Sequence, residues 1–311
     1  MKEFICTTPV ALIIFNRPGL TQQVFTAIRK VRPVKLLVIA DAPRPDQKDD
    51  IENCALARKI IEEIDWECEV VKNYAANHLG CGKRPATGID WIFSLVEEAI
   101  ILEDDCLPHT TFFPYCQELL KKYSEDERIM SISGNNFQYG RRRTEDSYYF
   151  SRYSQTCGWA TWKRAWQHYD FDMKLWPEIR KGQWMSDIFG SIQVVEQNHQ
   201  LRFKMTGGLS VIEYWQQIFD VVYHKEIDAW DFQFAFASFL QNGLHILPNM
   251  NLVSNIGYGP DATHTRHAGS SLANLQAEAM DFPLRHPPFI IRDAWADAFL
   301  QANNFSCDRW E

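Results

Sequence analysis

The chain has 311 residues, of which 46% are hydrophobic and 23% are charged, and its formal net charge is −8. A chain of this size can bury a substantial core, and it is long for a single compact domain. The negative charge offers no electrostatic footprint for nucleic acid, so a nucleic-acid partner is excluded from the expectations.

The sequence also bears on the cellular compartment. The opening residues MKEFICTTPVALIIF hold too short an apolar run for a signal sequence, and no later segment approaches a membrane span. Eight cysteines without CxxC spacing match neither a zinc site nor a small disulfide framework. These features together predict a cytoplasmic protein with reduced, structural thiols.

Apolar runs alternate with helical periodicity over the first 123 residues. The pattern predicts strands over 9–15, 34–40, 68–72 and 99–102, and helices over 20–30, 51–64, 88–98 and 110–123. Because both faces of the strands are apolar, we expect an α/β fold with a mostly parallel sheet flanked by helices. Ligands of such sheets bind outside the carboxyl ends of the strands.

Polar residues follow each predicted strand and should therefore meet along one rim of the sheet. They are Asn16 and Arg17, Asp41, the loop from Gly80 to Arg84, and the cluster Glu103, Asp104 and Asp105.

The acidic cluster carries the most chemical information. Three adjacent carboxylates repel one another unless a cation or hydrogen-bond donors offset the repulsion. Hard oxygen ligands select magnesium, manganese or calcium, and one such cluster leaves room for substrate phosphates in the metal's shell. The competing interpretation is an acidic turn in which Asp105 caps the helix predicted over 110–123.

At this point the chain resembles the GT-A glycosyltransferases, and within them the inverting N-acetylglucosaminyltransferase I type of N-glycan branching enzyme. The resemblance covers roughly residues 9–265. It is carried, in order, by ILEDDCLPHTTFFPYCQELL, SISGNNF (131–137), YFSRYSQTCGWATWKRAWQHY (149–169), IDAWDFQFAFASFLQNGLHILPNMNLVSNIG (227–257) and ATHT (262–265).

The resemblance implies a nucleotide-sugar site with Mn²⁺ (or Mg²⁺) as cofactor. Asp105 would ligate the metal, while Glu103 and Asp104 would bind the donor or orient neighbouring groups. Asp41 resembles the carboxylate that reads the uracil edge, with an Asx-turn as the alternative.

Three further groups of donor-binding residues follow from the resemblance. Asn16 and Arg17 would lie beneath the base and ribose. Gly80 and Gly82 would let the backbone approach the ligand closely, and Lys83 or Arg84 would offer charge to phosphate.

The segment GWATW and a later histidine complete the expected donor site. Gly158 permits a backbone conformation closed to other residues, and Trp159 offers a flat apolar surface to a sugar ring, whereas Trp162 and Trp166 are expected in the core. His264 matches a family histidine on a loop that closes over the nucleotide.

Inverting transfer also needs a general base. The related enzymes use an aspartate in a Trp-Asp-Asp segment, and this chain departs from that pattern with Asp228-Ala229-Trp230-Asp231. We favour Asp231 and keep Asp228 as the alternative. Either residue would equally serve as a helix N-cap.

The sequence thus predicts a GT-A type α/β fold with a mixed C-terminal acceptor-side region. Residues 1–130 would bind the nucleotide sugar, 131–265 would form the acceptor and catalytic half of the same domain, and 266–311 form a tail of unassigned role. The expected enzyme transfers a sugar from a nucleotide diphosphate sugar to a glycan or lipid-linked saccharide. We expect the donor to be a UDP-sugar, and a lipid-linked acceptor would bring the enzyme into peripheral contact with a membrane. Its rivals are a sugar nucleotidyltransferase and a non-catalytic carbohydrate-binding protein.

Overall fold

The strand–helix alternation of the first 123 residues is confirmed. The computed structural model describes residues 4–190, 192–197, 200–205, 209–259 and 273–305. The elements of this part are β1 (Val10–Ile14), α1 (Pro18–Val31), β2 (Lys35–Ala40), α2 (Lys48–Ile60), the 3₁₀ turn η1 (Ile61–Glu63), β3 (Glu69–Tyr74), α3 (Gly80–Leu95), β4 (Glu98–Glu103) and α4 (Phe112–Lys122).

One helix boundary was wrong. Helix α3 begins at Gly80, eight residues before the predicted start at 88, so the segment from Gly80 to Arg84 is helical rather than a loop. Glycines and Pro85 conceal the helix, since both residue types ordinarily disfavour a helix interior.

The rest of the chain adds further helices and strands. They are β5 (Cys106–Pro108), β6 (Ile129–Ser133), β7 (Tyr148–Ser151), β8 (Trp159–Trp162), α5 (Lys163–Trp166), α6 (Trp176–Lys181), α7 (Trp184–Phe189), β9 (Ile192–Gln197), β10 (Gln200–Met205), α8 (Leu209–Tyr223), α9 (Asp231–Leu240), β11 (Leu244–Pro248), β12 (Val253–Asn255) and α10 (Ala294–Asn304).

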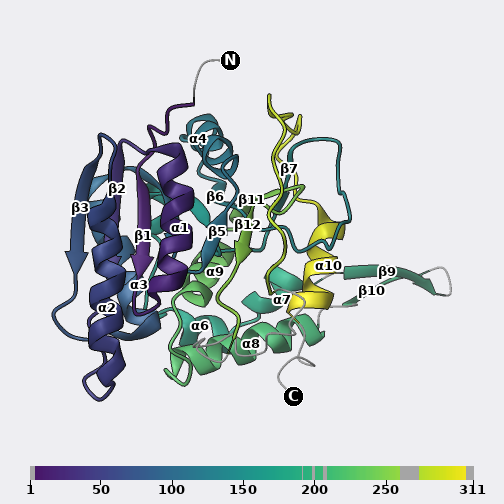
Figure 1. The fold of residues 1–311 in the computed structure, drawn as a ribbon. Helices are drawn as coiled ribbons and strands as arrows, with labels where there is room; N and C mark the ends of the chain where they lie inside the picture. Colours follow the sequence, from purple (N-terminus) through teal and green to yellow (C-terminus); the bar gives the residue numbers. More distant parts are fainter. Residues whose placement is uncertain (1–3, 191, 198–199, 206–208, 260–272, 306–311) are drawn as a thin grey trace.

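A single eight-stranded sheet organises the molecule, in the order β3-β2-β1-β4-β8-β6-β11-β7. Strands β3, β2, β1 and β4 are parallel, and β11 is parallel to β6. Strand β8 runs antiparallel to both of its neighbours, β4 and β6, and β7 is antiparallel to β11. The sheet is thus mostly parallel in its first half and mixed in its second, and one sheet takes in strands from both sides of residue 130 (Figure 1).

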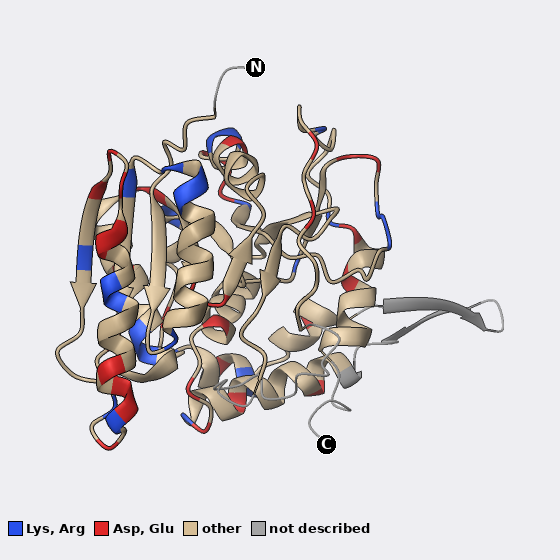
Figure 2. Cartoon of the chain, viewed as in Figure 1, with Lys and Arg blue, Asp and Glu red and all other residues tan. Residues whose placement is uncertain are grey.

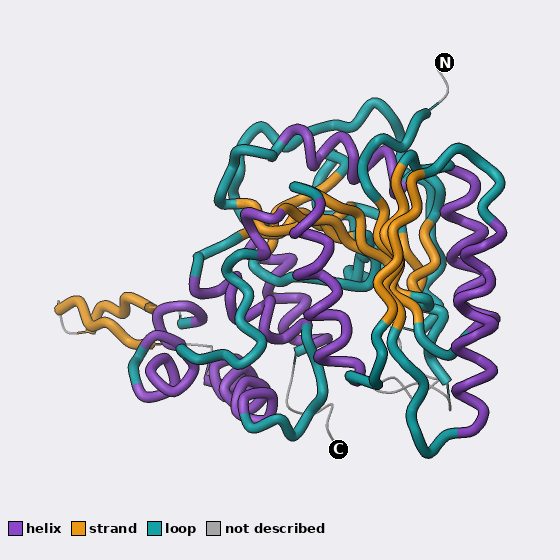
Figure 3. The backbone as a smooth tube through the Cα atoms, turned by 90° about the vertical axis from the view of Figure 1, so that its left-hand side faces the viewer, coloured by secondary structure: helices purple, strands orange, loops and turns teal. Residues whose placement is uncertain are grey.

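Helices cover both faces of the sheet, and the side chains of β1 show why. Val10, Leu12 and Ile14 belong to one buried cluster, and Ala11 and Ile13 belong to another on the opposite face. Figure 2 shows β1 without a charged residue along its length, and Figure 3 shows the sheet between helical layers. Such two-sided burial is what selects a continuous apolar run over an alternating one.

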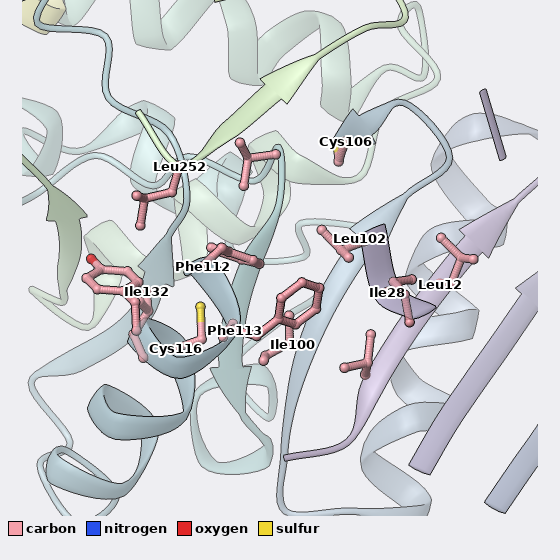
Figure 4. Close-up of a cluster of buried hydrophobic side chains, with 14 of the residues drawn as sticks. Leu12, Ile28, Ile100, Leu102, Cys106, Phe112, Phe113, Cys116, Ile132 and Leu252 are labelled. Carbon is pink, nitrogen blue, oxygen red and sulfur yellow. The ribbon is translucent and has the colours of Figure 1, made fainter. Parts of the chain in front are cut away.

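The larger cluster lies under α1 and α4. Leu12, Ile100 and Leu102 from the sheet pack with Phe112 and Phe113 of α4 (Figure 4). A third cluster, formed chiefly by α6 to α10, supports the C-terminal half. None of the helices in the described ranges combines the length and apolar character needed to cross a bilayer.

Candidate functional site

A cavity of about 550 Å³ opens at the carboxyl ends of β1, β2 and β4, where the sequence placed a binding cleft. Its walls come from the loops after those strands, from the start of α3 and from the residues that lead into α9. The predicted site residues that line it are Asn16, Arg17, Asp41, Gly80, Arg84, Glu103, Asp104, Asp105, Asp228 and Asp231.

Arg17 and the acidic cluster form the centre of the cavity wall. The Arg17 guanidinium donates to Asp104 and lies 3.1 Å from the carboxylate of Asp105. Asp104 is only 2% exposed and also accepts the Phe15 N–H at 3.3 Å. Asp104 therefore holds the β1–α1 loop, while Asp105 is the more accessible carboxylate.

The positive charge of Arg17 does not offset the negative charge of the three carboxylates in the cluster. Burial, then the charges of Asp105 and Asp104, raise the pKa of Glu103 well above its ordinary value. Burial also raises the pKa of Asp104, in spite of Arg17. A cation added here would lower both values.

The donor set fits a divalent cation in part. In the described portion of the chain, no three His, Cys, Asp or Glu side chains are gathered tightly enough to hold a metal by themselves. Carboxylate oxygens are nevertheless the ligands that magnesium and manganese prefer, and these ions ordinarily take further oxygens from substrate phosphates. Asp105 would hold the ion, and a diphosphate would have to complete the shell.

The position of Asp105 depends on a glycine that the sequence analysis did not single out. The Ile256 N–H donates to the Asp105 carbonyl at 2.9 Å, and a Cβ on Gly257 would collide with the Asp105 carboxylate. Asp105 does not cap α4, whose first turn has no side-chain cap. The interpretation of the cluster as a helix cap is therefore wrong.

Gly80 and Gly82 have a different neighbour from the expected one. A Cβ on either would collide with the carboxylate of Asp228, and one on Gly82 would also lie 2.9 Å from the Ala229 nitrogen. Gly80 has a φ of +86°, and the Cys81 thiol donates to the Asp228 carbonyl at 3.0 Å. These glycines thus make room for the chain that leads into α9.

Of the two basic residues in this segment, Arg84 lines the cavity and Lys83 does not. Arg84 is buried and donates to the carbonyls of Ala40 at 3.2 Å and Asn73 at 2.6 Å, so it ties the ends of β2 and β3 together. Lys83 is exposed and is not part of the cavity wall.

Asp41 holds the start of α3. Its buried carboxylate accepts the N–H groups of Leu79 and Gly80, each at 3.0 Å, and that of Ala42 at 2.8 Å. These bonds satisfy helix-terminal donors that would otherwise lack partners. Asp41 also lines the cavity, beside His78 at 3.0 Å, and its role toward a base stays a prediction.

A carboxylate that the sequence analysis missed supports the neighbouring wall. Asp50, 3% exposed, accepts the Asn16 amide at 2.7 Å and the Arg44 guanidinium at 2.6 and 2.9 Å. Asn16 and Arg44 both line the cavity. Phe15 lies between Arg44 and His78, with ring centroids 5.2 Å apart for Phe15 and His78.

Both candidate bases line the cavity together with the acidic cluster. Asp231 is the first residue of α9, and Trp230 precedes it without a side-chain cap. Asp231 is close enough to Glu103 to contribute, after burial and the nearer aspartates, to the raised pKa of that residue. Asp228 is exposed, and its carboxylate lies against Gly80 and Gly82.

The remaining predicted residues lie elsewhere. Trp159 is 1% exposed and stacks on Trp230 at a centroid distance of 5.6 Å, so it packs in the core beside Trp166 instead of offering a surface to a sugar, and Trp162 is buried in another cluster. Gly158 has a φ of +68°, and a Cβ there would meet Val253 at 2.7 Å. His264 lies outside the described residues.

Two solved structures that match the chain are only distantly similar to it. No family model and no curated protein matches the chain. Among solved structures, 4-diphosphocytidyl-2C-methyl-D-erythritol synthase from Anaerococcus prevotii is 10% identical, with a TM-score of 0.32, over 51% of this chain and 73% of that one. A UDP-glucose pyrophosphorylase complexed with UDP-glucose is 11% identical, with a TM-score of 0.33, over 78% and 90% of the two chains. Neither is a glycosyltransferase, and the kinship with the N-acetylglucosaminyltransferase I type stays a prediction.

Proposed function

We propose that the chain is a metal-dependent, inverting GT-A glycosyltransferase that takes a UDP-sugar as donor. One observation carries the proposal: the acidic cluster, Arg17 and Asp231 line the same cavity at the strand ends. A metal-bound diphosphate needs the acidic cluster and Arg17, and a hydroxyl nucleophile needs a base such as Asp231.

The proposal gives the residues of the cavity wall separate roles. Asp105 would hold the metal together with the diphosphate, and the Arg17 guanidinium would offer charge-assisted hydrogen bonds to phosphate oxygens. The bound metal would stabilise the negative charge of the departing nucleoside diphosphate. Asp231 takes the proton of the acceptor hydroxyl as that oxygen attacks the anomeric carbon from the opposite side, in a transition state with oxocarbenium character.

The proposed organisation assigns the first half of the sheet to the donor. Residues 1–130 supply the part of the cavity wall from Ile13 to Cys106, and the half from 131 to 265 supplies the rest, Asp231 included. The acceptor is a glycan or a lipid-linked saccharide, as in cell-envelope or capsule polysaccharide synthesis.

Sugar nucleotidyl transfer is the second candidate. The same acidic cluster and Arg17 would suit a nucleoside triphosphate, with a sugar phosphate as the attacking group. Against it, the β1–α1 loop FNRPG contains one glycine and is poor in the basic residues that cradle a triphosphate. The distant structural matches carry no weight for either candidate.

One pair of assays separates the candidates. The protein is incubated with Mn²⁺ and a panel of nucleotide sugars, and slow release of nucleoside diphosphate is measured. In parallel, UTP and sugar 1-phosphates are supplied, and pyrophosphate is measured. The glycosyltransferase proposal expects the first activity, abolished by EDTA, and no pyrophosphate; the reverse result would establish nucleotidyl transfer in its place.

A further inference from the structure

Two cysteines face each other in the wall of the cavity. The thiol of Cys106 lies 3.4 Å from the sulfur of Cys157, and both residues line the cavity. Cys106 is 2% exposed, at the margin of the core cluster in Figure 4, whereas Cys157 is only partly buried. Neither residue has a role in the transfer mechanism described above.

Their surroundings distinguish Cys106 and Cys157 from the other described cysteines, none of which is in a disulfide. Cys106 directly follows Asp105 and pairs with Asn255 in the β5–β12 ladder. Cys157 precedes Gly158, whose carbonyl accepts the Gly134 N–H at 2.8 Å. Both backbones are therefore held in place, and the two sulfurs are fixed opposite each other although 51 residues separate them.

We propose that Cys157 and Cys106 form a thiol–disulfide exchange site that accepts low-molecular-weight disulfides, and that a ligand in the cavity shields it. The sulfurs are at non-bonded contact, and an S–S bond of about 2.05 Å requires them to close by roughly 1.4 Å. A closure of that size is within the reach of side-chain rotation.

The reaction has two steps, with oxidised glutathione as the co-reactant. The thiolate of Cys157, the accessible partner, attacks one glutathione sulfur, breaks the glutathione S–S bond and releases one glutathione, which takes up a proton. The Cys106 sulfur then attacks Cys157 in the mixed disulfide, forms the protein disulfide and releases the second glutathione, which carries the other proton. Two protein thiols are oxidised, and one disulfide is reduced to two thiols.

The shielding part rests on the proposed nucleotide site. Cys106 is joined to Asp105, and its thiol lies 3.5 Å from that carboxylate, so a diphosphate bound there would lie beside the sulfurs. With ligand at about ten times its Kd, about one cavity in eleven stays empty, and the oxidation rate should fall about tenfold. The two equilibria are linked, so the effect is reciprocal. If the ligand disfavours the disulfide by a given factor, the disulfide should lower the affinity for the ligand by the same factor.

The test uses the reduced full-length chain with excess oxidised glutathione, followed by mass spectrometry. We expect loss of two hydrogens, a cross-linked peptide joining the Cys106 and Cys157 segments, and reversal by dithiothreitol. Cys106→Ser should stop at one stable glutathione adduct on Cys157, and Cys157→Ser should yield neither product. Cys116→Ser is the matched control, because Cys116 shares a tryptic peptide with Cys106 and lies outside the cavity wall.

The outcomes are distinct. The exchange site is overturned if the parent gains no disulfide, if the bond joins other cysteines, or if Cys106→Ser and Cys157→Ser give the same products. If a variant does not fold, the presence or absence of the Cys106–Cys157 cross-linked peptide in the parent protein is the deciding result. If UDP with Mn²⁺ raises the melting temperature yet leaves the oxidation rate unchanged, the shielding is refuted; if neither responds, it is the proposed nucleotide site that fails.

Discussion

At the scale of single residues, the carboxylate of Asp105 is more accessible to a ligand than that of its neighbour Asp104. Asp104 is enclosed by Arg17 and the Phe15 N–H, and Glu103 completes β4. The difference in accessibility gives three chemically similar neighbours three separate tasks. It also makes their substitutions distinguishable.

We expect Asp105→Asn to weaken nucleoside diphosphate binding strongly in Mn²⁺ and little in EDTA, because the amide oxygen is a poorer ligand for a hard cation. Isothermal titration in the two buffers measures the difference. Glu127→Gln, an exposed change remote from the cavity, is the control. Equal affinity of variant and parent in saturating Mn²⁺ would remove Asp105 from the metal site.

Asp231→Asn should keep nucleotide and metal affinity but lose transfer by ~10²–10⁴-fold, the usual contribution of a general base. Asp228→Asn should retain most activity, because its carboxylate packs against Gly80 and Gly82 and an amide of the same shape fills the same space.

NMR of the product tests the stereochemistry of the same transfer reaction. The transferred sugar should have the opposite anomeric configuration to the donor. Parental rates for Asp231→Asn, or inactivity of Asp228→Asn alone, would place the base at the other aspartate. Retention of configuration would refute the inverting mechanism.

Single-residue roles were only partly predictable from the sequence. Hydrophobic runs followed by polar residues identified Arg17, Asp41 and the acidic cluster, all of which reach the cavity. The partnership of Gly80 and Gly82 with Asp228 joins positions nearly 150 apart, and no local pattern encodes such a contact. Trp159 misled because a buried aromatic and a sugar platform have the same sequence signature.

At the scale of elements, α2 is joined to two cavity loops through Asp50 in its first turn. The Arg44 side chain, then the Asn16 amide, lower the pKa of Asp50 to about 2, although burial opposes the shift. A carboxyl with a lowered pKa in the folded state stabilises the fold above its unfolded pKa of about 3.9, and this contribution is lost as the pH falls toward 2.

Asp50→Asn should therefore lower the free energy of unfolding at pH 7 by about 1.5–3 kcal/mol, the usual value for hydrogen bonds to a charged group. The deficit relative to the parent should shrink as the pH falls from about 4 toward 2. Urea unfolding across this range measures it, with exposed Asp49→Asn as the matched control. A deficit that is independent of pH would show that the ionised carboxylate is not the source.

Elements were predictable where periodicity was strong and unpredictable where a tertiary contact decides. The first three strands and both helices between them follow from their apolar patterns. The start of α3 does not, because Asp41, from the end of another strand, satisfies its N-terminal amides. Strands of three to five residues, such as β5 and β8, are too short for a pattern to distinguish them from buried loops.

At the scale of the whole molecule, the cavity size is that of an ordinary small-ligand site. Uridine diphosphate should raise the melting temperature more than guanosine or cytidine diphosphate in Mn²⁺, since binding to the folded state stabilises it. Differential scanning fluorimetry at matched concentrations ranks the three. A clear preference for guanosine diphosphate would refute the uracil assignment of Asp41 and leave the fold untouched.

The place of β8 in the sheet has a consequence for biosynthesis. Strand β4 is finished at Glu103, but its partner on one edge, Trp159–Trp162, is made more than 50 residues later. Until then the nascent chain presents an unpaired apolar edge, which is the feature that recruits other strands in aggregation. A fragment ending before β8 should therefore depend on chaperones for its survival, and the ribosome's speed through residues 104–162 becomes a determinant of yield.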